Sequence, residues 1–124
     1  MKKILGSVLA ISVLLSAIYA SGKDAWTGES QPLKGSYFIY GGELGEVVPP
    51  TQNDRKLAIE ITGQPAKEMF ESMYPDFQPT CSGEKGDRDR RKGNVYCSYS
   101  AGGAYRCFLG FDLRTGKSIA GASC

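Results

Sequence analysis

The most densely charged stretch of the sequence is residues 87–92, which read DRDRRK. Arginine can bind a carboxylate through two parallel hydrogen bonds, so it is well suited to recognising an acidic surface. Arg88, Arg90 and Arg91 are therefore predicted to bind a partner protein from a glycine-flanked loop, Gly83–Gly93. The alternative interpretation is a solvated hairpin tip with weak internal ion pairs.

The same stretch offers little to a metal ion. Asp87 and Asp89 are spaced like the first two ligands of a calcium-binding loop. Arg91 and Lys92, however, stand where further oxygen ligands would have to follow. The sequence also contains no histidine, which is the commonest metal ligand in proteins. No metal and no cofactor is predicted.

A second candidate for chemistry is a pair of carboxylates. Glu43 and Glu46 lie on either side of Gly45. Paired carboxylates can act as general acid and base, as in glycoside cleavage. The absence of histidine excludes Ser-His and Cys-His catalysis, and no phosphate-binding loop or nucleophile motif is present. The chain is predicted not to be an enzyme, with a carboxylate-based hydrolase acting on envelope material as the alternative.

The elements that must position these side chains follow from hydrophobic periodicity and turn residues. Strands are predicted at Gly35–Tyr40 and Lys56–Thr62, a helix at Pro65–Tyr74, and three further strands at Asn94–Ser100, Ala104–Asp112 and Ser118–Cys124. The segments Glu43–Asp54 and Asp76–Gly93 are predicted to be loops. The fold class is α+β: a small antiparallel sheet in the order β-β-α-β-β-β, with one short helix packed on one face and two disulfides.

One apolar stripe on the predicted helix matches one face of the predicted sheet. Its residues recur at the spacing of a single helix face and are Ala66, Met69, Phe70 and Met73. In the last three strands, alternation places the cysteines and most of the large apolar side chains on one common face. The helix is therefore predicted to cover that face, so its methionines and phenylalanine belong to the core.

The four cysteines, Cys81, Cys97, Cys107 and Cys124, are predicted to form two disulfides, because an even number in a small exported chain is typical of a disulfide framework. A hairpin centred on Gly102 places Cys97 opposite Cys107. A second hairpin centred on Thr115-Gly116 would place Cys107 opposite Cys124. Pairing 97–124 would have to span two strand spacings and is disfavoured. Two pairings remain: 81–97 with 107–124, which is favoured, or 81–124 with 97–107.

The N-terminus has the pattern of a secretory signal peptide over residues 1–20, with cleavage after Ala20 or alternatively after Gly22. Two lysines precede the apolar run Ile4–Leu15, and small residues follow it. An uncleaved membrane anchor is the alternative. The predicted location is the periplasm or the exterior of a bacterium, without stable membrane insertion after cleavage.

The mature chain is predicted to be a flexible arm, residues 21–34, followed by one disulfide-stapled α+β domain, residues 35–124. Trp26 in the arm could cover one end of the core or form part of a binding surface. Loss of Lys2 and Lys3 with the signal reduces the basic residues from 15 to 13, which equals the 13 acidic ones. A neutral domain lacks the electrostatic footprint of a nucleic-acid-binding protein.

Together these features predict a small exported binding module without enzymatic activity. Its predicted partner is another protein, such as an envelope-acting enzyme, which would make the chain an inhibitor or an immunity-type protein. The loops Gly83–Gly93 and Gly41–Asp54 are predicted to carry the contact. A structural subunit of an envelope assembly, joined through sheet edges, is a further alternative.

Overall fold

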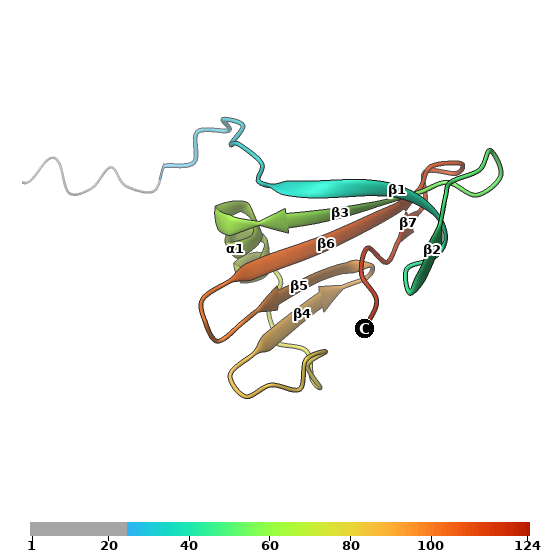
Figure 1. Cartoon of the computed structure of the whole chain (residues 1–124). Coiled ribbons are helices and arrows are strands. Elements are labelled where there is room, and N and C mark those ends of the chain that lie inside the picture. The colour runs from blue at the N-terminus through green and yellow to red at the C-terminus, as the bar shows by residue number, and fades with distance from the viewer. Residues whose placement is uncertain (1–24) are drawn as a thin grey trace, which may run out of the picture. The chain divides into compact units, whose positions relative to one another are not determined.

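The computed structural model describes residues 25–124, and these divide between two compact units. Residues up to Gln31 belong to the first unit, whose described part, residues 25–31, contains no helix or strand, and Trp26 there is 92% exposed. The second unit, Pro32–Cys124, contains all of the described secondary structure (Figure 1). The signal peptide and its cleavage site lie outside the described residues. The function of Trp26 stays a prediction.

The second unit is an α+β fold built on one antiparallel sheet (Figure 1). Its neighbours follow the order β2-β1-β3-β6-β5-β4, and β7 pairs with β6. The strands are β1 Gly35–Glu43, β2 Glu46–Val48, β3 Lys56–Thr62, β4 Arg88–Lys92, β5 Val95–Tyr99, β6 Tyr105–Asp112 and β7 Ser118–Ile119. The predicted fold class and the approximate order of elements are therefore confirmed.

Two strands lie where loops were predicted. β2 follows a two-residue turn at Leu44-Gly45 and pairs with the end of β1. β4 consists entirely of charged residues and pairs with β5 through a two-residue turn at Gly93-Asn94. The prediction that the arginines occupy a loop is therefore wrong. Hydrophobic periodicity does not reveal β4, because it identifies a strand only where every second side chain is apolar.

One helix, α1 Gly63–Ser72, packs against β6, β3 and β5 (Figure 1). The buried core comprises Ile61, Ala66, Phe70, Met73, Cys97 and Cys107, with Met69 packed against it. The predicted helix stripe and the predicted core face are thus confirmed. The sulfur of Cys97 lies 3.5 Å from that of Met73, so the helix rests directly on the cross-strand bridge.

The register of the first hairpin is confirmed, whereas that of the second is wrong. Cys97 lies opposite Cys107. β7 instead pairs Gly110 with Ile119 and ends after two residues, so Cys107 does not face Cys124. A side chain at Gly110 or Gly121 would collide with backbone atoms of the other segment. These glycines therefore let the C-terminal segment pass close to the backbone of β6. A side chain at either position would not fit into this close approach.

The favoured disulfide pairing, Cys81–Cys97 with Cys107–Cys124, is wrong. The bonds are Cys81–Cys124, with Cα atoms 5.6 Å apart, and Cys97–Cys107, with Cα atoms 4.0 Å apart. This is the second pairing that the sequence leaves open. The physical reason is the shift in the second hairpin, which releases Cys124 from β6 and lets it reach Cys81.

We expect the double variant Cys81→Ser/Cys124→Ser to lose about 4 kcal/mol of unfolding free energy, because a long closed loop restricts the unfolded chain most. The Cys81–Cys124 bond joins residues that are 43 positions apart in the sequence. Urea unfolding without reductant measures the loss. A non-reducing peptide map of the variant should still contain the Cys97–Cys107 linkage. A loss below about 1 kcal/mol would contradict the expectation that the Cys81–Cys124 bond stabilises the fold by restricting the unfolded chain.

Candidate functional site

The two candidate carboxylates face each other across a hairpin. Glu43 and Glu46 are cross-strand partners at the Leu44-Gly45 turn, and both are exposed. Neither lines any of the three surface pockets described in this unit. Within residues 25–124 no group of acidic or sulfur ligands could hold a metal ion. Catalysis by this pair stays an untested alternative, and its geometry is that of a solvated hairpin tip.

Two of the three predicted binding arginines hold the end of the helix. Arg88 and Arg90 both donate to the carboxylate of Asp76, at 2.8 and 2.9 Å. Arg90 also donates to the carbonyl oxygen of Phe70 at 2.7 Å, and its guanidinium lies 4.3 Å from the centre of the Phe70 ring. A cation at this position satisfies a helix C-terminal carbonyl and complements the helix dipole. These contacts fasten β4 to α1.

The pKa of Asp76 reports on this clamp. Hydrogen bonds from Arg88 and then Arg90 lower the pKa of Asp76 from 3.8 to about 2. A carboxyl group whose pKa is lower in the folded state than in the unfolded state stabilises the fold. This stabilisation is complete at pH values above the unfolded-state pKa, and it is lost as the pH falls through the folded-state pKa.

We therefore expect the difference in unfolding free energy between the wild type and Asp76→Asn to be constant above about pH 5 and to shrink as the pH falls toward 2. Urea unfolding over a pH series measures it. Glu71→Gln, which alters an exposed carboxylate in the last turn of α1, is the control. A difference that stays constant down to pH 2 would show that the clamp does not depend on the ionised carboxyl group.

Arg91 has a different environment from the other two arginines. It is exposed, it makes no ion pair within residues 25–124, and its guanidinium lies 4.8 Å from the centre of the Tyr96 ring and 5.3 Å from that of Phe77. Of the three arginines, it is the one that has no ion pair within the described residues. Its predicted contact role remains a prediction.

We expect Arg90→Glu to lower the unfolding free energy by at least about 2 kcal/mol, because it places a like charge beside Asp76 and removes one of the two donors to the Phe70 carbonyl oxygen. Arg91→Glu should lower it by less than about 1 kcal/mol, because the side chain is exposed. Thermal and urea unfolding of the two variants measure this contrast. Equal losses would mean that Arg91 is also structural, and that charge reversal cannot test its contact role.

A buried carboxylate that sequence reasoning missed lies in the same strand. Asp89 is 3% exposed, and its side chain accepts a hydrogen bond from the backbone N–H of Cys81 at 2.6 Å. The backbone N–H of Phe77 donates to the Asp89 carbonyl oxygen at 2.7 Å. Burial and the nearby Asp89 carboxylate raise the pKa of Tyr96 to about 12. Asp89 therefore fixes the segment that carries Cys81 along the outer edge of β4.

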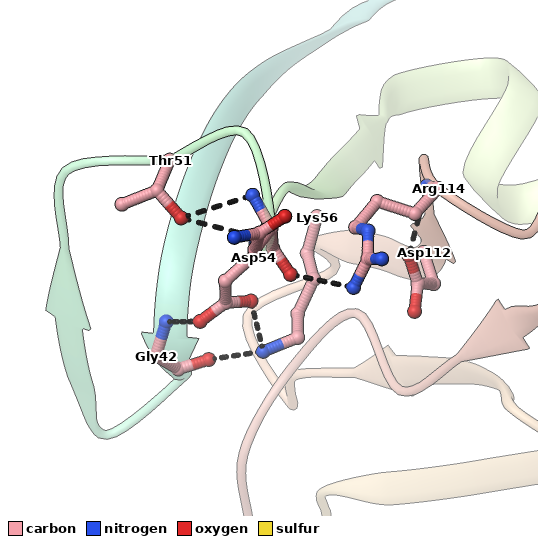
Figure 2. A network of polar contacts seen from close by, with 7 residues as sticks. Gly42, Thr51, Asp54, Lys56, Asp112 and Arg114 are labelled. Atoms are coloured by element: carbon pink, nitrogen blue, oxygen red, sulfur yellow. Dashed lines mark hydrogen bonds and ion pairs between the residues drawn. The ribbon is translucent and has the colours of Figure 1, made fainter.

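A polar network fixes the other end of the sheet (Figure 2). The Asp54 carboxylate accepts from the backbone N–H of Gly42 at 2.7 Å and pairs with Lys56 at 2.9 Å. Lys56 also donates to the Gly42 carbonyl oxygen at 2.6 Å, and Arg114 donates to that of Asn53 at 2.7 Å. The hydrogen bond from Gly42 is the main cause that lowers the pKa of Asp54. The network holds the loop beside β1 and so sets where the β2 pairing begins.

An apolar groove lies on the side of the sheet that α1 covers only in part. Its volume is about 480 Å³, and its apolar lining is Leu33, Tyr37, Ile39, Leu57, Ile59 and Leu113. A helix about 10 Å in diameter covers roughly two strands at a spacing of about 4.8 Å. Because α1 contacts β3, β5 and β6, the helix-side face of β1 remains open. Tyr37 is 71% exposed and Ile39 40% exposed as a result.

The groove adjoins a strand edge with free backbone groups. β2 pairs only with residues 41–43 of β1, so the outer edge of residues 35–40 has no strand beside it within the described chain. The backbone N–H of Thr62 donates to the carbonyl oxygen of Lys34, and β1 pairs with β3 in the same register. Hydrogen-bonded and non-hydrogen-bonded pairs alternate in an antiparallel ladder. Gly35, Tyr37 and Ile39 therefore direct their backbone N–H and C=O groups outward.

Comparison of the chain with protein-family models, with curated proteins and with solved structures finds no match in any of the three. The geometry of the groove and of the β1 edge is therefore the basis for a functional assignment. The sequence does contain a signal for this site, because GSYFIY is an aromatic, uncharged strand. Periodicity alone does not reveal that both its edge and its helix-side face stay open.

Proposed function

We propose that this chain is a non-enzymatic protein-binding module that works in the periplasm or outside the cell. Its contact surface is the apolar groove together with the outer edge of β1. Two disulfides support a location outside the reducing cytoplasm. No helix of the described chain has the length and apolar character to cross a bilayer. The N-terminal pattern of a signal peptide agrees with export.

The observation that carries this proposal is the chemical character of residues 35–40. They contain no charge and no proline, and Tyr37, Phe38 and Ile39 are all exposed. Edge strands are normally protected by charges, proline or a covering segment, because a bare edge pairs with other chains. An extended segment of another protein can add to such an edge as a new strand, while neighbouring pockets receive its side chains.

The groove supplies the specificity that backbone pairing lacks. Tyr37 and Ile39 point to the helix side, the same side as Leu57 and Ile59, so every second side chain of an added strand would meet the groove. A suitable ligand segment is extended and has apolar residues at alternate positions. An envelope-acting enzyme presenting such a segment would be the partner of an inhibitor or immunity-type protein, and Arg91 offers a second contact for an acidic part of that partner.

We expect residues 21–124, with both disulfides intact, to select peptides with alternating apolar residues from a phage-displayed random library. Tyr37→Lys should weaken binding of a selected peptide at least tenfold, because the substitution replaces an apolar wall of the groove by a charge. Fluorescence anisotropy with the synthetic peptide measures the affinity.

The matched control is Tyr74→Lys. Tyr74 is also 71% exposed but does not line the groove. This variant should bind the peptide as the wild type does. Failure to enrich any peptide, or equal weakening by the two variants, would count against a binding surface at β1.

A further inference from the structure

The two ends of the sheet carry opposite chemistry. β4, at one end, consists of five charged residues, and Phe77 bridges to Asp89 on its outer side. Residues 35–40 of β1, at the other end, contain no charged residue, and no strand of the described chain pairs with their outer edge (Figure 1). Charged side chains and covering segments are the usual protection of a sheet edge. One edge of this sheet is therefore closed to pairing and the other is open.

We propose that the open edge pairs with β1 of a second copy of this chain, in a two-fold symmetric antiparallel dimer. This inference rests on the binding surface proposed above and names its occupant. A β1-to-β1 contact is the same patch on both subunits, so it closes after two copies. The protected β4 edge prevents head-to-tail growth into a filament. The balanced charge expected for the mature chain also leaves no net repulsion between copies.

The backbone fixes the register of this contact. Only Gly35, Tyr37 and Ile39 direct hydrogen-bonding groups outward. The register that uses all three places Tyr37 opposite Tyr37 of the second copy and Ile39 opposite Gly35. Gly35 has no side chain and is one of the residues that line the groove. The Ile39 side chain of each copy can therefore lie over the groove of the other.

The groove would enlarge the dimer contact beyond the two paired strands. Pairing of five residues alone is a small contact, whereas a specific interface buries roughly 1,200 Å² or more in total. On the helix side of the joined strands, the two grooves become neighbours across the two-fold axis. Leu33, Tyr37 and Ile39 of each copy, which are 69%, 71% and 40% exposed in the single chain, would then be covered.

Light scattering after size-exclusion chromatography, over roughly a hundredfold range of concentration, measures the oligomeric state. We expect residues 21–124 to elute at twice the mass of one chain at the upper end of the range. Tyr37→Lys should be monomeric throughout, and Tyr74→Lys should dimerise as the wild type does. A monomeric wild type at all concentrations, or a dimer that survives Tyr37→Lys, would overturn the proposal.

Cross-linking tests the register independently of affinity. Directly opposed residues of a hydrogen-bonded pair have Cα atoms about 5.5 Å apart, which suits a disulfide. In a glutathione buffer, Tyr37→Cys should therefore form a covalent dimer. Ile39→Cys and Tyr74→Cys should not, because neither position meets its own copy. Equal cross-linking of all three variants would reject this register.

The dimer and the peptide-binding function can fail separately. If the protein is monomeric but still binds a selected peptide, and if Tyr37→Lys abolishes this binding, the proposed function stands and the dimer is rejected. A dimer that binds no peptide would retain the self-contact alone. If both hold, saturating peptide should convert the dimer to monomer, because the two ligands compete for one edge; a dimer unaffected by bound peptide would place the self-contact elsewhere.

Discussion

The rest of the structure depends on the pairing of β5 with β6, in which Cys97 lies opposite Cys107. This register decides which side chains of the last strands are buried, and it places a disulfide beneath the helix with both cysteines fully buried. α1 lies on that bridge, with Met73 against one sulfur. β4 then continues the sheet from β5, and its arginines reach back to the helix end through Asp76. The core and the charged clamp thus follow from one fixed alignment.

The open surface follows from the size of the helix. Ten residues of helix are about 15 Å long and cover only part of a sheet of this width. The covered part lies over β5, β6 and the near side of β3, where the disulfide and Phe70 are. The uncovered part lies over β1 and the far side of β3. An exposed apolar surface next to an unprotected edge usually indicates an interaction site.

Much of the scaffold could be predicted from residues alone, for physical reasons. Period-2 alternation around Gly102 fixes the Cys97–Cys107 register, and a 3.6-residue stripe identifies Phe70 as core. β4 could not be predicted, because all of its residues are charged and the sequence therefore shows no alternation of apolar and polar side chains. Its arginines are instead held by contacts with Asp76, Phe70 and Tyr96. The choice of Cys81–Cys124 over the other open pairing could not be predicted either, because it depends on the close approach of the Gly110 and Gly121 segments, a backbone contact that turn rules do not describe.

The position of the two disulfides has a mechanical consequence. Both lie in the part of the chain from Cys81 onward: one joins the segment before β4 to the C-terminal segment, and the other joins β5 to β6. Residues 32–62, which contain β1, β2 and β3, have no cysteine and join the stapled half mainly through the β3–β6 ladder. Under load or on local opening, the β1–β3 half would unzip along this ladder as one cooperative unit while the stapled half keeps its shape. A strand added at β1 would then strengthen the half of the molecule that lacks covalent support.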